Sequence, residues 1–164
     1  MTSVEPVVRV LFVCTGNTCR SPLAAAALAR ELGDDARRVA IRSAGVAAAE
    51  GLPASEGTRA VALAAGVDLS AHRSRRAVAS EVREADFVFV MEPSHRQALE
   101  ALGVPGGKVH VLSEWPEPGE RELPVSDPFG ASKEAYEECW RRIGRHVKRI
   151  APSVRQALQA RSAS

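Results

Sequence analysis

The sequence predicts an α/β fold: a doubly wound, four-stranded parallel sheet with helices on both faces. Short apolar, β-branched runs alternate with stretches of helical periodicity along the whole chain. At 164 residues, 45% of them hydrophobic, the chain is long enough for one domain that buries most of its apolar surface. We therefore expect one domain over residues 1–164, with a flexible basic tail from about residue 151.

The first strand, loop and helix are predicted between residues 7 and 33. The apolar run Val7–Val13 is interrupted only by Arg9, as expected of a strand buried on both faces. Ser21 followed by Pro22 is typical of a helix start, with the serine as N-cap and proline at the first helical position. Gly33 is typical of a helix end.

Three more strands and three more helices follow. Residues 39–45, 86–91 and 108–112 predict strands. Residues 55–66 and 94–103 predict helices, the first of them with Ser55 as N-cap. A last helix starts near Ser132, because apolar side chains recur on one face at Tyr136, Trp140, Ile143, Val147 and Ile150. Ligands of such folds bind beyond the carboxyl ends of the strands, so we expect the site in the loops that follow Val13 and Leu112.

Composition argues against several classes of partner. The 22 basic and 20 acidic residues give a net charge of only +2, so neither a nucleic acid nor another polyanion is expected. The seven basic residues after Cys139 are interpreted as a solvated helix face. No stretch is apolar enough to span a membrane. With three cysteines and no secretory leader pattern, we expect a cytoplasmic protein without a disulfide framework.

The loop from Cys14 to Arg20 has the composition of a phosphate site. It joins a strand end to a helix N-terminus, so backbone N–H groups converge there with the helix dipole behind them. These donors stabilise a thiolate, the nucleophilic form of cysteine. Arg20 adds a planar guanidinium that binds two phosphoryl oxygens. We expect Gly16 and Asn17 to supply the unusual backbone torsions of a tight ring.

Other interpretations of this loop fit its spacing less well. The loop contains neither G-x-x-x-x-G-K nor G-x-G-x-x-G, the patterns of nucleotide and dinucleotide sites. Four residues separate Cys14 from Cys19, instead of the two typical of zinc or thioredoxin-type pairs, so we expect no metal and no cofactor. The remaining alternative is that both cysteines are ordinary buried hydrophobic side chains.

The segment VCTGNTCRSP resembles the signature of the low-molecular-weight protein tyrosine phosphatase family, C-x5-R-S near the N-terminus. The segments RSAGV, DLSAHRSR and DPFG fall where that family has corresponding segments, so the resemblance covers nearly the whole chain. It implies the fold of that family and hydrolysis of phosphorylated proteins through a phosphocysteine, with inorganic phosphate as product. By position, Cys14 is the nucleophile, Arg20 the phosphate clamp and Asp127 the general acid and base.

The resemblance also assigns supporting residues. It implies that Asn17 is held by Ser21, Ser43 and His72, a network that would lock the loop before phosphate binds. Phe129 would form an apolar wall beside the substrate. The remaining phosphate-binding positions are Thr15, Gly16, Thr18 and Cys19. Asp127 also fits without the resemblance, because its loop follows the fourth strand and Pro128 stiffens it, although an isolated Asp-Pro more often marks a turn.

Thr18 bears on the substrate. Tyrosine-specific members typically have isoleucine here, whereas members resembling the protein-arginine phosphatases have threonine. Threonine is shorter in reach and can hydrogen-bond, which favours a planar, donor-rich guanidinium over a phenyl ring, with Asp127 also contacting the guanidinium nitrogens. Phe129 in place of tyrosine points the same way. We expect a protein-arginine phosphatase, with phosphotyrosine as the alternative substrate. The other possibility is that variation among valine, threonine and isoleucine at position 18 has no effect on the substrate.

Further alternatives concern the cysteines. Cys19 can trap an oxidised nucleophile as a disulfide, which would give redox regulation, or it can simply pack in the core. Arsenate reduction would need a downstream cysteine pair, but only Cys139 remains. A non-catalytic module that binds phosphorylated residues would need neither a nucleophilic thiol nor an acid. Glu92, His95 and His110 receive no role.

Overall fold

A parallel sheet of four strands lies at the centre of the molecule, as the sequence predicts. The computed structural model describes residues 8–116 and 124–162, so Val7 and the acidic residues of 117–123 lie outside it. The strand order is β2-β1-β3-β4. The strands are β1 (Val8–Cys14), β2 (Val39–Gly45), β3 (Phe87–Val90) and β4 (Val109–Val111).

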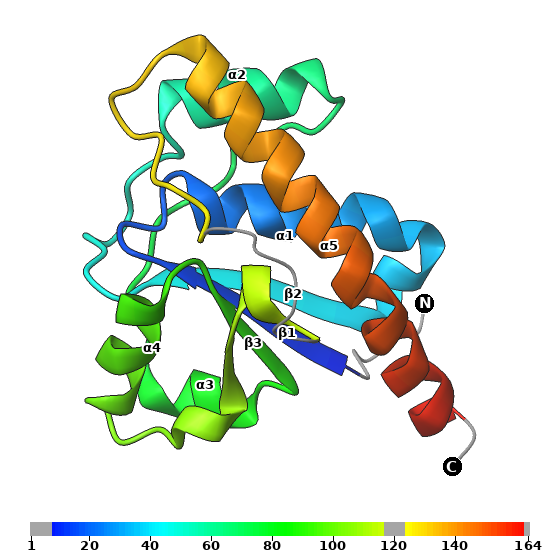
Figure 1. Ribbon diagram of the computed structural model, residues 1–164. Helices are drawn as coiled ribbons and strands as arrows, with labels where there is room; N and C mark the ends of the chain where they lie inside the picture. Colours follow the sequence, from blue (N-terminus) through cyan, green and yellow to red (C-terminus); the bar gives the residue numbers. More distant parts are fainter. Residues whose placement is uncertain (1–7, 117–123, 163–164) are drawn as a thin grey trace.

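Helices cover both faces of the sheet (Figure 1). On one face lie α1 (Arg20–Leu32) and α5 (Lys133–Ser162), with α2 (Glu56–Ala64) packed against them. On the other lie α3 (Ala79–Glu84) and α4 (Pro93–Glu100). Short 3-10 helices occupy Gly33–Arg38, Gly106–Lys108 and Leu112–Glu114. The predicted α/β architecture is therefore confirmed.

Each face of the sheet has its own apolar core, because side chains alternate along a strand. On β1, Phe12 packs in the core under α1 and α5, whereas Leu11 and Val13 pack in the core under α3 and α4. Cys14 follows the same alternation and belongs to the α1 side. The pairing of Cys14 with Gly45 aligns the ends of β1 and β2 at one edge of the sheet.

Helix starts show where local signals succeed and fail. Ser55 caps α2 as predicted, since its side chain accepts a hydrogen bond from the Thr58 N–H. Ser21 is not the N-cap of α1: the helix begins at Arg20, and Cys19 precedes it without a side-chain capping bond. The six residues of α3 were not predicted, because so short a segment shows no helical period.

The last helix is longer than the sequence indicates. Instead of a flexible tail from about residue 151, α5 continues to Ser162 with Pro152 inside it. Val154 and Leu158 extend the apolar stripe by two more turns and are 0% and 3% exposed, so tertiary packing holds the segment despite the proline. No helix in the described ranges has the length and apolarity needed to cross a membrane.

Candidate active site

Cys14 lies at the carboxyl end of β1 with its sulfur directed into the β1–α1 loop. The residue is 2% exposed. The backbone N–H of Asn17 donates to Sγ at 3.3 Å, and the Ser21 hydroxyl lies 2.9 Å from Sγ. The Ser21 hydroxyl has one hydrogen, which can be donated to Sγ or to the Ala44 carbonyl oxygen at 3.3 Å, so the Asn17 N–H is the fixed donor to the sulfur.

Asn17 holds the loop together. It has a left-handed backbone, with φ of 57°. Its Nδ2 donates to Ser21 Oγ at 2.8 Å and to Ser43 Oγ at 3.0 Å. Its Oδ1 accepts from the Arg75 N–H at 3.0 Å, and its carbonyl oxygen lies 2.7 Å from His72 Nε2. The structure thus places around Asn17 the three supporting residues that the resemblance implies, Ser21, Ser43 and His72, and adds the backbone of Arg75.

The glycine that the loop needs is Gly45, on the neighbouring strand. Gly16 was expected to supply an unusual torsion, but its φ is not left-handed, and a Cβ there would meet only Thr18 Oγ1, at 3.8 Å. A Cβ on Gly45 would lie 2.5 Å from the Thr15 carbonyl oxygen and 3.0 Å from the Asn17 nitrogen. The ring therefore depends on close packing of two backbones, which a pattern for one loop does not reveal.

Arg20 connects the loop to the segment that carries the acid. Its guanidinium is 2% exposed. Nη2 donates to Thr15 Oγ1 at 3.2 Å and lies 3.7 Å from Asp127 Oδ2. Nη1 donates to the Val125 carbonyl at 3.1 Å and to Glu92 Oε2 at 3.3 Å. Since most of its donors are fixed by protein groups, the guanidinium is held in one orientation before any anion binds.

Two residues without a predicted role, Glu92 and His95, belong to this site. Glu92 precedes α4; burial raises the pKa of its carboxyl, but a hydrogen bond from Ser94 and the charge of Arg20 lower it overall. His95 is 1% exposed, and its Nε2 lies 2.9 Å from Thr15 Oγ1 and 3.4 Å from Glu92 Oε1. Burial and the charge of Arg20 lower the pKa of His95 to about 4.

A signal for these two residues was present in the sequence. They follow the strand β3, which lies beside β1. The rule that ligands bind beyond the carboxyl ends of parallel strands applies to that loop as much as to the loops after β1 and β4.

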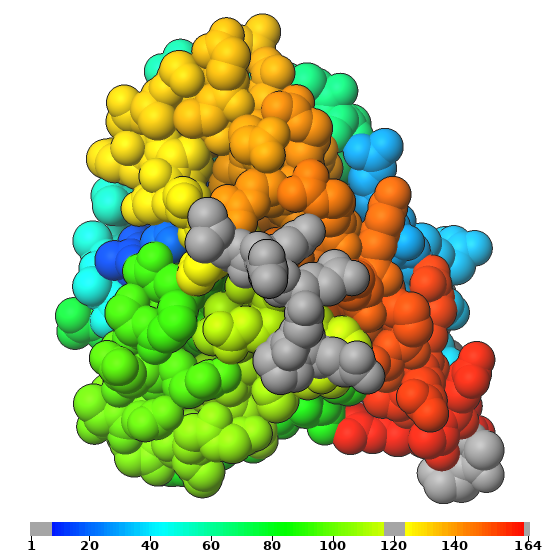
Figure 2. Space-filling model, in the orientation of Figure 1, coloured from blue at the N-terminus to red at the C-terminus, as the bar shows by residue number. Residues whose placement is uncertain are grey.

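A cleft of about 330 Å³ opens above the loop. In Figure 2 the blue surface of the β1–α1 region is bordered by yellow, green and cyan surface, which are segments far apart in the sequence. Leu52 and Phe129, which are 48% and 68% exposed, form an apolar rim of the cleft. The sequence predicted this position for Phe129 but not for Leu52. The cleft is lined by Cys14, Thr15, Gly16, Thr18, Cys19, Arg20, Ala47, Ala49, Leu52, Asp127 and Phe129.

Asp127 stands at this rim with its carboxylate half exposed. Its Oδ1 accepts a hydrogen bond from the Phe129 N–H at 3.1 Å, an Asx turn that fixes the short loop. The position brings a carboxylate to the mouth of the cleft that contains the Cys14 sulfur. A carboxyl group in this position can exchange a proton with a molecule bound in the cleft.

The other two cysteines have different surroundings. Cys19 is 4% exposed, and its Sγ lies 3.2 Å from Ser55 Oγ and 3.7 Å from Tyr136 Oη. Cys139 on α5 is buried, and burial raises the pKa of its thiol to about 12. Cys139 therefore stays protonated near neutral pH. All three cysteines are free thiols. In the described part of the chain, no three histidine, cysteine or acidic side chains are grouped to hold a metal ion.

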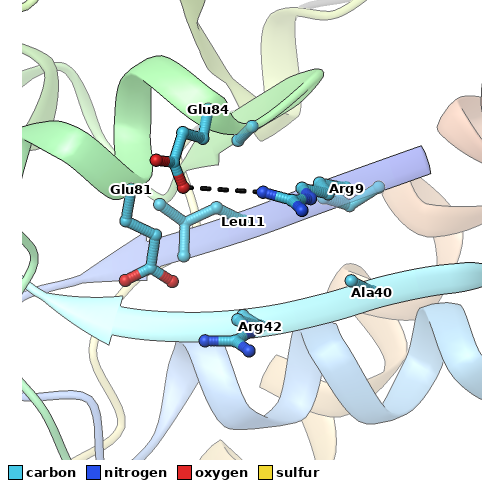
Figure 3. A pocket seen from close by; sticks show the side chains of 8 residues that line it. Arg9, Leu11, Ala40, Arg42, Glu81 and Glu84 are labelled. Carbon is cyan, nitrogen blue, oxygen red and sulfur yellow. Dashed lines mark hydrogen bonds and ion pairs between the residues drawn. The ribbon is translucent and has the colours of Figure 1, made fainter. Parts of the chain in front are cut away.

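A second cleft, of about 170 Å³, lies at the other end of the strands. Figure 3 shows Arg9 and Arg42 on neighbouring strands, with Glu81 and Glu84 of α3 close to them. Arg9 and Glu84 form an ion pair at 3.5 Å. Arg9 and Cys14 are five positions apart on the extended strand, a distance of roughly 16 Å. This cleft contains no nucleophilic side chain, so we place the candidate active site at the β1–α1 loop.

Comparison with known proteins agrees with this geometry. The family model described as low molecular weight phosphotyrosine protein phosphatase matches residues 9–161. The chain is 34% identical to the low molecular weight protein-tyrosine-phosphatase Wzb of Salmonella typhimurium, over 93% of this chain and 95% of Wzb. It is 33% identical to a protein-arginine-phosphatase of Geobacillus stearothermophilus, over 89% and 95%.

A solved structure shows the same arrangement of the chain. The YwlE arginine phosphatase from Geobacillus stearothermophilus superposes with a TM-score of 0.80 at 32% identity, covering 91% of this chain and 94% of that one. Both the sequence match and the fold extend over nearly the full length, and every one of these relatives is a protein phosphatase. The chain therefore belongs to the low molecular weight phosphotyrosine protein phosphatase family and is itself a protein phosphatase, a hydrolase.

Proposed function

We propose that Cys14 and Asp127 hydrolyse phosphorylated protein side chains in two steps. The Cys14 thiolate attacks phosphorus and forms a sulfur–phosphorus bond, while the bond to the substrate breaks and the leaving atom takes a proton from Asp127. Asp127, now ionised, then accepts a proton from water, which attacks the phosphocysteine and releases inorganic phosphate and the thiolate. The presence of both groups in one cleft, with the Arg20 guanidinium beside Asp127, supports this proposal.

The phosphoryl group is held by Arg20 and the backbone N–H groups of residues 15–20. A phosphoryl group in transfer carries negative charge on three equatorial oxygens, and donors that are already in place stabilise that charge without reorganisation. The hydrogen bonds of the Asn17 amide to Ser21 and Ser43, and the contact of its carbonyl oxygen with His72 Nε2, give the loop this rigidity. Removing one of them would loosen the ring without removing a catalytic group.

Within this reaction we propose phosphoarginine in proteins as the substrate. The observation that carries the proposal is Thr18, a short, hydroxyl-bearing side chain in the wall of the cleft. Asp127, at the mouth, can accept from guanidinium N–H groups as well as give its proton to the departing nitrogen. The similarity to a protein-arginine-phosphatase at 33% identity supports this substrate.

Phosphotyrosine is the second candidate. The exposed side chains of Leu52 and Phe129 flank the mouth of the cleft and would pack on the two faces of a phenyl ring. The chain is as similar to Wzb, a tyrosine phosphatase by name, as to the arginine phosphatase.

The decisive experiment compares kcat/KM of the purified protein on one peptide phosphorylated on arginine and on tyrosine. We expect the wild type to prefer phosphoarginine and Thr18→Ile to shift the ratio towards phosphotyrosine on the order of tenfold. Thr18→Val is the matched control, because it removes the hydroxyl and keeps the shape. A wild type faster on phosphotyrosine, or a ratio that Thr18→Ile leaves unchanged, would contradict the assignment.

The nucleophile is tested separately. Cys14→Ser should abolish turnover of both peptides while the variant still binds phosphate or vanadate, because Arg20 and the amide donors remain. Turnover at the wild-type rate in this variant would exclude Cys14 as the nucleophile. Cys139→Ser should keep full activity, since its buried, protonated thiol lies outside the cleft lining. The same thiol argues against a cysteine relay of the arsenate-reducing kind.

We also propose a reducing, cytoplasmic location and a redox switch in which Cys19 captures oxidised Cys14. A sulfenic acid on Cys14 would lose its oxygen as water when the Cys19 thiol attacks it, forming a disulfide. After treatment with hydrogen peroxide, peptide mass spectrometry should find Cys14 linked to Cys19, and dithiothreitol should restore activity. A Cys19→Ala variant should lose activity irreversibly under the same treatment; equal recovery would contradict the switch.

A further inference from the structure

The side chain of Thr15 stands between two hydrogen-bond donors. Arg20 Nη2 donates to Thr15 Oγ1 at 3.2 Å, and His95 Nε2 lies 2.9 Å from the same oxygen. Arginine never accepts a hydrogen bond, so one of the two contacts is fixed in direction. The direction of the other depends on which ring nitrogen of His95 carries the proton.

Two observations place that proton on Nε2. First, Nε2 lies 3.4 Å from Glu92 Oε1, and an unprotonated nitrogen would direct its lone pair at that carboxylate. Second, His95 Nδ1 is buried and has no hydrogen-bond partner among the described residues. A buried nitrogen lone pair without a partner costs less free energy than a buried N–H without a partner, and buried N–H groups without partners are rarer in protein interiors. His95 Nε2–H is therefore a donor to Thr15 Oγ1.

The hydroxyl of Thr15 then has no lone pair left. A hydroxyl accepts at most two hydrogen bonds and donates one. Both acceptor positions of Thr15 are taken by Arg20 and His95, so its hydrogen must be donated in the remaining direction. Within the described residues Thr15 Oγ1 has no hydrogen bond to an acceptor. The side chain lines the cleft that also contains Cys14 and Asp127.

We propose that the Thr15 hydroxyl is a donor to a phosphoryl oxygen of the substrate, and that His95 is the positioning residue that fixes it in this role. Ordinarily a hydroxyl rotates freely between donating and accepting. Here two flanking donors prevent the oxygen lone pairs from facing the phosphoryl group, where they would repel it. The inference rests on the proposed attack of Cys14 on phosphorus, but it holds for phosphoarginine and phosphotyrosine alike.

The charge state of His95 agrees with this role. Arg20, Glu92 and Asp127 are the charged groups that act on it, and burial with the charge of Arg20 outweighs the two carboxylates. With a pKa of about 4, the ring is neutral through the range in which phosphatases are assayed. A neutral ring donates from Nε2 without placing a second full charge beside Arg20.

The first test compares Thr15→Val with Thr15→Ser on para-nitrophenyl phosphate. Valine keeps the shape and removes the hydroxyl, so kcat should fall on the order of a hundredfold, the size seen when one donor to a developing oxyanion is lost. Serine restores the hydroxyl, so Thr15→Ser should retain clearly more activity than Thr15→Val. Equal rates in the two variants, or a Thr15→Val variant within twofold of wild type, would overturn the proposal.

The second test concerns His95 and uses the geometry of its amide analogues. A glutamine amide reaches the position of Nε2, whereas an asparagine amide reaches only that of Nδ1. We expect His95→Gln to keep much more of kcat than His95→Asn, although the two are equally polar. In the Thr15→Val background, replacing His95 by asparagine should cost little more, because there is no hydroxyl left to orient. Additive losses would show that His95 acts in another way.

Two controls keep the outcomes distinct. Thermal unfolding of each variant separates loss of the donor from loss of folded protein, and kcat and KM measured separately show whether the loss falls on kcat. Wild-type turnover of para-nitrophenyl phosphate, together with its abolition by Cys14→Ser, tests the proposed reaction itself. If that reaction is present and Thr15→Val leaves it intact, only the role of Thr15 and His95 is refuted.

Discussion

At the scale of single residues, the absence of a side chain at Gly45 is as important as the chemistry of Cys14. Any Cβ at Gly45 would overlap the backbone of the β1–α1 loop, at 2.5 Å from the Thr15 carbonyl oxygen. Backbone atoms cannot move aside as a flexible side chain can. The loop would therefore shift away from β2, and with it the donors that face the sulfur.

We predict that Gly45→Ala lowers kcat/KM on the order of a hundredfold, because displacement of catalytic groups by about 1 Å has that effect. The free energy of unfolding should fall by about 1–3 kcal/mol from overpacking. Gly107→Ala is the matched control: no atom lies within 4 Å of its Cβ, and its φ is not left-handed. Kinetics and urea unfolding measure both effects. Unchanged kinetics in Gly45→Ala would show that the ring does not depend on this contact.

His95 also makes stability depend on pH. Its pKa is about 4 in the folded protein against 6.5 for an ordinary histidine, so between these values the unfolded chain binds more protons. The contribution of His95 to the free energy of unfolding therefore has its full value above pH 6.5. As the pH falls towards 4, this contribution is lost, and the free energy of unfolding decreases by about 3 kcal/mol. In the His95→Gln variant, the glutamine side chain has no ionisable group and does not titrate in this range. Between pH 7 and pH 4.5, the free energy of unfolding measured with urea should fall by about 2–3 kcal/mol more in wild type than in His95→Gln. Equal decreases in the two proteins would contradict this.

At the scale of elements, the sequence is informative where one local pattern decides the structure. The β1 run, the cap at Ser55 and the helix end at Gly33 each depend on nearby residues, and the structure shows a strand at Val8–Cys14, the Ser55 cap and Gly33 as the C-cap of α1. Ser21 was misassigned as a cap because its hydroxyl has partners on Asn17 and the Ala44 carbonyl, which only the folded chain brings near. Local propensity does not encode such distant partners.

The same distinction explains the site. Cys14, Arg20 and the loop between them could be identified from spacing, and Asp127 from a short motif, because each motif is contiguous. Glu92 and His95 were missed, since they meet Thr15 and Arg20 only through the pairing of β1 with β3, which places the two loops side by side. Their place beside the cleft depends on tertiary contact and not on a local sequence pattern.

Two glycines inside helices should respond oppositely to alanine. At Gly144 in α5 nothing lies within 4 Å of an added Cβ, so Gly144→Ala should stabilise by about 0.5–1 kcal/mol through helix propensity. At Gly57 in α2 the Cβ would lie 2.3 Å from the Tyr136 ring, so the same change should destabilise the α2–α5 contact. Urea unfolding of both variants checks the pair, and a stabilised Gly57→Ala would contradict the packing described.

At the scale of the whole molecule, α5 ties distant parts of the chain together. The first half of α5 lies over α2 and the β1–α1 loop, where Tyr136 contacts Cys19. The last turn of α5 reaches the start of β3. There the Arg161 guanidinium donates to both carboxylate oxygens of Asp86, at 2.8 and 2.6 Å, and Asp86 also accepts from the Arg9 N–H. These hydrogen bonds lower the pKa of Asp86, and the one from Arg161 has the largest effect.

The last two turns of α5 are therefore part of the core, and Leu158 tests this. Leu158 is 3% exposed, and its truncation to alanine should reduce the free energy of unfolding by about 2–5 kcal/mol, as for other buried leucines. Gln159→Ala, at an exposed neighbour, should change stability by less than about 0.5 kcal/mol. Both variants should keep wild-type kcat at 20 °C or below, because neither residue approaches the cleft. Equal stabilities by urea unfolding would instead support a flexible tail, and would mean that α5 stabilises the fold only as far as Ile150.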